Sequence, residues 1–311
     1  MGELLSILFV RRLRVFRGHH LKVFDYMAHA ASLPWLQPRL YVGPQSEESV
    51  VARLIPPAVE RVQKIAPADL YFVSGFDWDL LDKSGIDTSA APVVHLIQHM
   101  YAADPGDLRH RFLERPALRI CVSPEIADVI APLAHGPVRI IPNGVDVRDV
   151  PESPITTGSR VFIGGLKNPA AAKTCAALLA AAGAEVDLCD GAVPRAEFLR
   201  RLKACAVSIL LPDPLEGFFL PALEAMALGS AVVVPDCVGT RSFCFDKRNC
   251  LVPAYDPGPI SSAALSLLRD AAGRAQIQLE GRTTAARYTL ERERAEAVEA
   301  FREVLEWRTA Q

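Results

Sequence analysis

The sequence predicts an α/β protein built from two domains, each a parallel sheet covered by helices. At 311 residues the chain is about twice the length of a typical single domain. Half of its residues are hydrophobic and under a quarter are charged, a balance that excludes a disordered chain and suits strands buried on both faces. Short apolar runs alternate with amphipathic or alanine-rich stretches, which is the pattern of strands alternating with helices.

Composition and charge exclude several functions. The net charge of -2 offers no general attraction to nucleic acid, and the sequence carries no nucleic-acid-binding motif. Seven cysteines, an odd number without a Cys-x-x-Cys pair, indicate free thiols in a reducing compartment rather than disulfides or a zinc site. No uncharged apolar run approaches the length of a membrane span. We therefore expect a soluble, cytoplasmic protein.

The first half of the chain contains the apolar runs of a first sheet. Leu4–Val10 predicts the first strand, and the basic segment that follows leads through Gly18 into a helix beginning near Leu21. Ser123-Pro124-Glu125 predicts the start of another helix, with a serine cap and a proline in the first turn. Further strands are expected at Leu40–Val42, Leu70–Ser74, Val93–Ile97 and Arg119–Ser123.

The second half shows the same alternation. A strand at Arg160–Ile163 precedes an alanine-rich helix that ends near Ala182, and an amphipathic helix is expected over Glu197–Lys203. Alternating Glu and Arg residues predict a helix with a solvated face over Leu290–Trp307. Further strands are expected at Ala184–Leu188, Ala206–Leu211 and Ala231–Val234.

The segment Leu210–Gly229 predicts a strand end, a tight loop and a short helix. Pro212 and Pro214 end the strand because neither can donate a hydrogen bond to the ladder. Pro221 fits the first helical position, and Gly229 fits a left-handed cap. A loop followed directly by a helix start is therefore expected.

The start of this helix predicts a binding site. Free backbone N–H groups over Gly217–Leu220 and the positive end of the helix dipole suit a phosphate or a sugar hydroxyl. Glu216 and Glu224 add carboxylate acceptors, which suit a ligand that also donates hydroxyls. The pattern indicates a nucleotide-sugar. For the two glutamates alone, the alternative is a pair of solvated charges at a helix entry.

The order of residues 216–229 resembles the signature of the retaining GT-B glycosyltransferases of the glycosyl transferases group 1 family, in which seven residues separate two glutamates. The resemblance continues at Ile140–Asp146, Ala231–Pro235 and Asn249–Pro253. It covers roughly the last half of the chain well, and the first half matches loosely.

The resemblance implies a GT-B fold, an α/β architecture of two Rossmann-like, doubly wound domains facing a central cleft. We expect an acceptor-side domain over residues 1–147, a nucleotide-sugar-binding domain over 148–288, and a helix over 289–311 that packs back on the first domain. The implied activity is a metal-independent hexosyltransferase without a cofactor, which moves a sugar with retention from a UDP- or GDP-linked donor. The acceptor would be a glycan, a lipid-linked or a small molecule in polysaccharide or glycoconjugate assembly.

The resemblance also assigns roles in the donor site. Glu216 would contact the transferred sugar next to its reacting carbon, and Glu224 would hold the ribose hydroxyls. The loop that contains Val193 would lie along the nucleobase. The backbone of four consecutive residues would meet the sugar and the diphosphate: Gly217, Phe218, Phe219 and Leu220.

The expected diphosphate contacts depart from the family pattern. Gly164 and Gly165 stand where the family has Gly-Arg, and an alanine replaces the lysine five residues on. A departing diphosphate needs cationic or N–H stabilisation, worth about 3 to 4 kcal/mol per good donor. Lys167 is the predicted substitute, with an ordinary surface lysine as the alternative interpretation. Lys173 and Arg241 are the other candidates.

The first half offers candidates through partial matches. The family carries a histidine at the end of the strand Val93–Ile97, where Gln98 stands here, and His99 is the better candidate against a surface histidine. Gly18 and His19 occupy the loop that in the family faces the donor phosphates or the acceptor. Four arginines around that loop could serve a phosphorylated acceptor or an anionic membrane surface, with a solvated rim as the alternative: Arg11, Arg12, Arg14 and Arg17.

Three further interpretations were open from the sequence. Asp77-Trp78-Asp79 matches the short metal-binding motif of the GT-A glycosyltransferases, but before a helix these aspartates also fit as caps, and no metal site is predicted. The missing arginine and lysine suggest, as an alternative function, a catalytically weak or inactive nucleotide-sugar-binding protein. A nicotinamide dehydrogenase is disfavoured because no Gly-x-Gly-x-x-Gly follows a strand.

Overall fold

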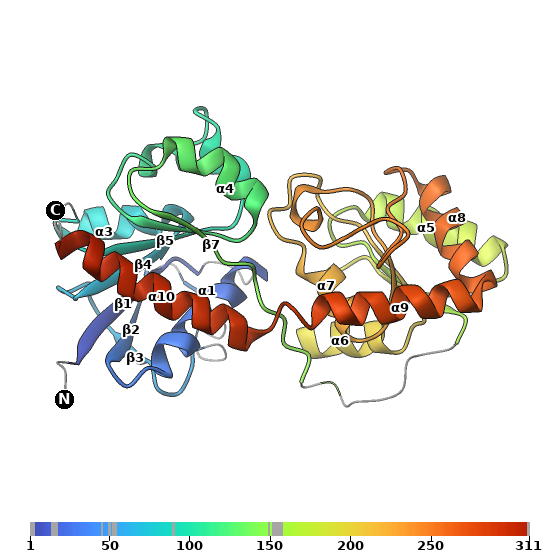
Figure 1. Ribbon diagram of the computed structural model, residues 1–311, viewed down its shortest axis with the longest axis horizontal. Helices are drawn as coiled ribbons and strands as arrows, with labels where there is room; N and C mark the ends of the chain where they lie inside the picture. Colours follow the sequence, from blue (N-terminus) through green and yellow to red (C-terminus); the bar gives the residue numbers. More distant parts are fainter. Residues whose placement is uncertain are drawn as a thin grey trace. The chain divides into compact units, whose positions relative to one another are not determined.

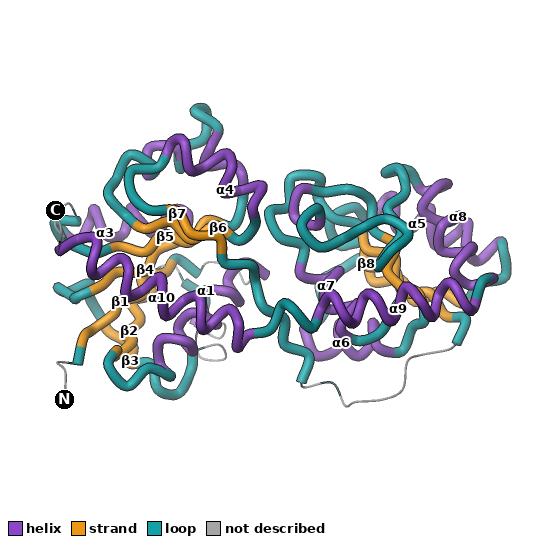
Figure 2. The backbone as a smooth tube through the Cα atoms, viewed as in Figure 1, coloured by secondary structure: helices purple, strands orange, loops and turns teal. Residues whose placement is uncertain are grey.

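The computed structural model describes residues 4–13, 18–44, 46–48, 51, 55–88, 91–148, 150 and 158–309. The chain forms two compact units, one of residues 1–142 with 291–311 and the other of residues 143–290. Each unit contains its own parallel sheet with helices packed on it (Figure 1, Figure 2). The predicted α/β class with two parallel sheets is therefore confirmed. All seven cysteines are free, as the sequence predicted.

In the described part of the first unit, seven strands form one sheet in the order β3-β2-β1-β4-β5-β6-β7. Every neighbouring pair is parallel, and the order changes direction between β1 and β4, as in doubly wound sheets. The strands are β1 (Leu5–Arg11), β2 (Leu36–Val42), β3 (Glu60–Val62), β4 (Leu70–Ser74), β5 (Val93–Ile97), β6 (Leu118–Cys121) and β7 (Val138–Ile140).

The helices of the first unit include one from the far end of the chain, α10 (Leu290–Thr309), which packs with α1 (Gly18–Ala31) (Figure 1). Nζ of Lys22 lies 2.6 Å from a carboxylate oxygen of Glu293, and both side chains are buried. Phe301 packs edge-on against Phe72 of β4, with ring centroids 6.4 Å apart. The remaining helical segments are η1 (Gly75–Asp77), α3 (Trp78–Ser84), η2 (Met100–Ala103), η3 (His110–Phe112), α4 (Pro124–Ile130) and η4 (Ala131–Leu133).

The second unit has, in its described residues, a four-stranded parallel sheet in the order β11-β10-β8-β9. Its apolar strand residues are buried together with residues of three helices, so the core lies on the sheet. The strands are β8 (Arg160–Gly164), β9 (Glu185–Cys189), β10 (Val207–Leu210) and β11 (Ala231–Val233). The helical segments are α5 (Pro169–Ala181), α6 (Arg195–Lys203), α7 (Leu220–Ala227), η5 (Val238–Thr240), α8 (Pro257–Arg269) and α9 (Ala271–Ala285).

Several element boundaries differ from those predicted. β2 begins at Leu36 rather than Leu40, because Pro38 and a neighbouring arginine interrupt the apolar pattern that the prediction used. β3 was not predicted, since a three-residue strand of Glu, Arg and Val has no apolar run. α1 begins at Gly18 rather than near Leu21.

The parallel sheets bring the carboxyl ends of neighbouring strands to one edge, where α/β proteins bind their ligands. In the second unit, the loops after β8 and β10 leave from adjacent strands, because Gly164 pairs with Leu210. None of the helices within the described residues combines the length and the apolar character that crossing a bilayer requires.

Candidate functional site

The loop between β10 and α7 carries most of the predicted donor-site residues. After the strand, the Asp213 carboxylate accepts from the Leu215 backbone N–H at 2.9 Å, and its carbonyl accepts from Glu216 at 3.0 Å, which turns the chain towards the helix. α7 begins at Leu220, one residue before the predicted Pro221. Gly229 ends it with a φ of 83°, which confirms the predicted left-handed cap.

The backbone donors at the start of α7 are fewer than predicted. The Phe219 N–H donates to the carbonyl of Gly239 at 3.1 Å, and the Leu220 N–H contacts the carbonyl of Phe218 at 3.2 Å. The prediction of free N–H groups at these two positions is therefore wrong. Within the described residues, the N–H groups of Gly217 and Phe218 have no acceptor.

Gly239 is the reason that one of these donors is occupied. A side chain at this position would lie 2.5 Å from the backbone nitrogen of Phe218 and 2.7 Å from the carbonyl oxygen of Glu216. Only a glycine lets the two loops approach so closely. The loop after β11 therefore packs directly on the segment that precedes α7.

The aromatic side chains beside this segment belong to the core. The Phe218 ring lies 5.4 Å from that of Phe243 and 6.1 Å from that of Tyr288, and it is buried. The Phe219 side chain is also buried, whereas Leu220 is half-buried. Any ligand contact of the two phenylalanines would therefore come from their backbone, as the resemblance implied.

Glu216 and Lys167 lie together at the ends of β10 and β8. Nζ of Lys167 is 3.2 Å from Oε2 of Glu216, and the two side chains are 49% and 16% exposed. The strands that precede them are neighbours in the sheet, which explains why residues so distant in sequence meet. A pair this open to water contributes at most about 1 kcal/mol to stability. Neither side chain is part of the hydrophobic core.

The Glu224 side chain is buried and forms an ion pair with Arg195, the first residue of α6. Its side chain is 3% exposed, against 35% for the arginine. Nη2 of Arg195 also donates to the backbone carbonyl of Asp146 at 2.8 Å. Arg195 was not predicted from the sequence as a site residue. The available signal was a cation at a helix start, where the helix dipole disfavours positive charge.

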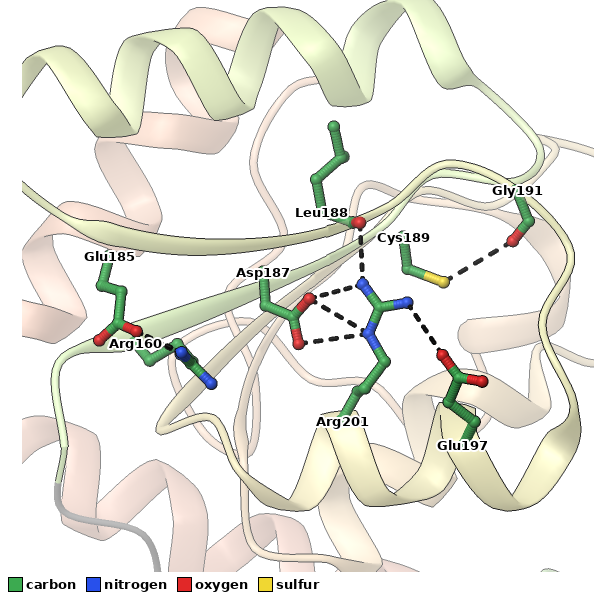
Figure 3. A network of polar contacts seen from close by, with 8 residues as sticks. All are labelled: Arg160, Glu185, Asp187, Leu188, Cys189, Gly191, Glu197 and Arg201. Atoms are coloured by element: carbon green, nitrogen blue, oxygen red, sulfur yellow. Dashed lines mark hydrogen bonds and ion pairs between the residues drawn. The ribbon is translucent and has the colours of Figure 1, made fainter.

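α6 is fixed against β9 by a polar network around Arg201 (Figure 3). Nη2 of Arg201 lies 2.5 Å from the Asp187 carboxylate and donates to the Leu188 carbonyl at 2.8 Å. The guanidinium also stacks over the Phe162 ring of β8, 5.7 Å from its centroid. This anchorage sets the position of Arg195 at the other end of the helix.

The glycine pair at the end of β8 has a packing reason. A side chain at Gly165 would lie 2.1 Å from the Cβ of Ala172 in α5, and one at Gly164 would lie 2.8 Å from a methyl group of Leu210. No arginine fits at Gly165 unless the helix moves away from the strand. The departure from the family pattern is thus built into the packing of α5 on β8.

The other predicted donor-side residues are placed around this edge. Lys173 forms an ion pair with Asp190 at 3.4 Å rather than with Glu216. Arg241 follows η5 and contacts the Asp236 carboxylate at 2.6 Å. Val193 lies half-buried in the loop before α6.

In the first unit, His99 is half-buried and precedes η2, with its ring 5.6 Å from that of Tyr101. Gly18 and His19 are the first residues of α1, and their side chains lie outside the described residues. Arg14 and Arg17 also lie outside the described residues.

Arg11 is buried and not part of a solvated rim, which corrects one of the interpretations of the basic segment. It forms an ion pair with Asp77, and its Nη2 lies 2.8 Å from Nδ1 of His20. Burial raises the pKa of Asp77 to about 6, against the opposing effect of Arg11 and of the backbone N–H groups of Ser74 and Arg12.

The Asp-x-Asp motif is used for ion pairs within the first unit. Asp77 contacts Arg11, and Asp79 lies 2.7 Å from Arg111 and 3.7 Å from Arg12. In the part of the chain that the structure describes, no group of three or more His, Cys, Asp or Glu side chains is placed to hold a metal ion.

Comparison with known proteins adds a family match over part of the chain and a fold. Residues 156–270 match the family model described as Glycosyl transferases group 1. Among curated proteins, none matches the chain. The solved structure of sucrose-phosphate synthase from Thermosynechococcus elongatus is similar with a TM-score of 0.69 and 12% identity, over 96% of this chain and 99% of that chain.

Two further solved structures have the same fold. HepE from Anabaena, in complex with UDP and glucose, matches with a TM-score of 0.73 and 13% identity over 96% of this chain and 100% of that chain. A glycosyltransferase from Rickettsia africae matches with a TM-score of 0.70 and 10% identity over 97% and 98%. The second unit thus carries the Glycosyl transferases group 1 match, and the chain as a whole has the fold of the GT-B glycosyltransferases.

Proposed function

We propose that this protein transfers a sugar from a nucleoside diphosphate donor to an acceptor, with retention of the anomeric configuration. The observation that carries the proposal is the contact between Lys167 and Glu216, 3.2 Å apart at the mouth of α7. At this edge of a parallel sheet, a cation can bind the diphosphate of a nucleotide-sugar and a carboxylate can bind the hydroxyls of its sugar. The family match over residues 156–270 supports the same activity.

The proposed roles follow from charge. Lys167 and the N–H groups of Gly217 and Phe218 would stabilise the diphosphate as it departs, in a site where donors aimed at developing charge lower the barrier. Glu216 would accept hydrogen bonds from the sugar hydroxyls next to the reacting carbon. Glu224 would hold the ribose, and the loop with Val193 would lie along the base. Protein cations, rather than a metal ion, would meet the diphosphate charge.

We also propose a donor and an acceptor class. HepE structures hold UDP, glucose and UDP-glucose, which makes UDP-glucose the first donor to test and GDP-linked sugars the second. The first unit would hold the acceptor, with His99 and the start of α1 at Gly18 and His19 as its candidate contacts. A glycan, lipid-linked or small-molecule acceptor in glycan assembly fits the family, and Arg12, Arg14 and Arg17 of the basic segment are the candidate membrane contact.

The test is product formation from a panel of UDP-, GDP- and ADP-sugars with mono- and oligosaccharide acceptors, followed by NMR of the new linkage. We expect one donor to be consumed and the product to keep the anomeric configuration of that donor. Activity should persist in EDTA. An inverted product would contradict the retaining mechanism, and loss of activity in EDTA would contradict the metal-independent one.

A second candidate function is binding of a nucleotide-sugar without transfer. The glycine pair Gly164 and Gly165 favours it, because its packing against α5 leaves no room there for the cation that the family uses. Calorimetry with the same donors separates the two functions. Tight donor binding without product, at every acceptor tested, would favour the binding protein.

A further inference from the structure

Arg195 joins three segments of the second unit. Its Nη1 forms an ion pair with Oε1 of Glu224 in α7, and its Nη2 donates to the backbone carbonyl of Asp146 at 2.8 Å. The Asp146 carboxylate lies 2.8 Å from Arg148, whose hydrogen bonds lower the pKa of that aspartate. The guanidinium of Arg195 is therefore held through both of its terminal nitrogens.

The place of Arg195 in α6 does not explain why an arginine stands there. It is the first residue of the helix, where the dipole disfavours a cation and where an acidic residue would be stabilising. The helix itself is anchored through Arg201 and Asp187, at 2.5 Å (Figure 3). The contact with Glu224 compensates for the unfavourable position.

Glu224 is a nearly buried carboxylate with half of its acceptor capacity unused. Its side chain is 3% exposed, and within the described residues only Oε1 is hydrogen-bonded. Oε2 has no partner within the described residues and is not among the fully buried atoms that lack one, so part of its surface is in contact with solvent. An ionised carboxylate accepts about four hydrogen bonds, and buried polar atoms are normally satisfied.

We propose that Arg195 is the positioning residue of the ribose site: it holds Oε1 of Glu224 so that Oε2 accepts from the ribose hydroxyls of a nucleoside diphosphate. The inference rests on the proposed function. A guanidinium is planar and always charged, and two fixed nitrogens set its orientation, so the carboxylate is ordered before the ligand arrives. Arg195 acts through Glu224 and need not touch the ligand.

The test compares UDP with 2′,3′-dideoxy-UDP by calorimetry at constant salt. Hydrogen bonds to a charged group predict that the wild-type protein binds UDP about tenfold to a hundredfold more tightly than the analogue. In Arg195→Gln this ratio should fall below about threefold, because the carboxylate is no longer oriented, while the affinity for the analogue changes by less than about twofold. If GDP binds more tightly than UDP, GDP and its dideoxy analogue take their place.

Two variants accompany this comparison. Arg160→Gln is the matched control, since Arg160 forms an ion pair with Glu185 on the same unit (Figure 3), and it should leave the ratio unchanged. Arg195→Lys keeps the charge but loses the two-nitrogen geometry, so the ratio should recover in part. If thermal melting shows that Arg195→Gln is unfolded, Arg195→Lys carries the same comparison.

Different outcomes would overturn the positioning role of Arg195 and the proposed function. In a Glu224→Gln background, Arg195→Gln should have no further effect on UDP affinity. A further loss there, or equal weakening of UDP and the analogue by Arg195→Gln alone, would overturn the positioning role. A wild-type protein that binds none of UDP, GDP and ADP would instead overturn the proposed function.

Discussion

Two ion pairs, one in each unit, show how differently the chain uses charge. Arg11 and Asp77 in the first unit are each 3% exposed, and the aspartate also accepts from two backbone N–H groups. Lys167 and Glu216 in the second unit are 49% and 16% exposed. The carboxylate of the buried pair is satisfied by the protein itself, whereas the open pair retains acceptor and donor capacity for a ligand.

This difference separates a structural from a functional use of charge. Removing one partner of a buried pair leaves an uncompensated charge in a medium of low dielectric constant, which is strongly destabilising. Removing one partner of an exposed pair changes stability by less than about 1 kcal/mol. Mutation of the buried pair should therefore lower stability, and mutation of the open pair should lower activity.

The largest effect is expected for Arg11→Met, which leaves the Asp77 carboxylate buried without its partner. The free energy of unfolding should fall by about 3 to 5 kcal/mol, measured by urea unfolding at pH 7. Arg12→Met is the control, since Arg12 lies 3.7 Å from Asp79 and is 28% exposed, and it should cost less than about 1 kcal/mol. Equal costs for the two variants would remove the distinction between buried and open pairs.

Glu216→Ala should give the next largest effect, in turnover rather than stability. Loss of an oriented acceptor at the reacting sugar predicts a decrease of about a hundredfold, or about 2.7 kcal/mol, in steady-state assays. Glu185→Ala, which removes a glutamate that is 59% exposed in the same unit, is the control and should leave turnover unchanged. Full activity in Glu216→Ala would refute the catalytic assignment.

The buried cluster around Lys22 predicts a pH effect of intermediate size. Burial lowers the pKa of His29 to about 3, and Lys22 and Arg294 act in the same direction, while Glu293 lies 3.9 Å away. The unfolded chain takes up the proton near pH 6.5, so the stability that this neutral histidine contributes above pH 6.5 is lost as the pH falls towards 3.

Between pH 7 and pH 5 this histidine should cost the wild-type protein about 2 kcal/mol of stability. His29→Gln should remove that part of the pH dependence in urea unfolding at the two values. His135→Gln, at an exposed position, should not. A wild-type slope that His29→Gln leaves intact would show that groups other than His29 cause the pH dependence.

The smallest effect is expected for Lys167→Gln. Because half of this side chain is exposed, its interaction with the diphosphate is screened, and turnover should fall about tenfold, or about 1.4 kcal/mol. Stability should change by less than about 1 kcal/mol. Lys173→Gln is the matched control, because Lys173 contacts Asp190. A greater loss of turnover in Lys173→Gln would assign the role of diphosphate cation to that lysine.

Sequence patterns predicted the elements whose signals are local. β4 and β5 have the predicted bounds, Ser123 caps α4 through the N–H of Ile126 at 3.3 Å, and Gly229 ends α7. Apolar runs, caps and left-handed glycines act over a few residues, so the chain order alone contains them. The segment from Glu216 to Glu224 was identified in the same way.

The tertiary structure decided which of these groups are available for chemistry. It places Arg195 beside Glu224 and Lys167 beside Glu216 as ion pairs. It also gives the Phe219 N–H an acceptor in the carbonyl of Gly239. Each of these contacts links segments far apart in the sequence, and each depends on how strands align and how closely loops pack. A single sequence specifies the residue types but does not show their spatial partners, and a hydrogen bond or ion pair exists only when both partners are in place.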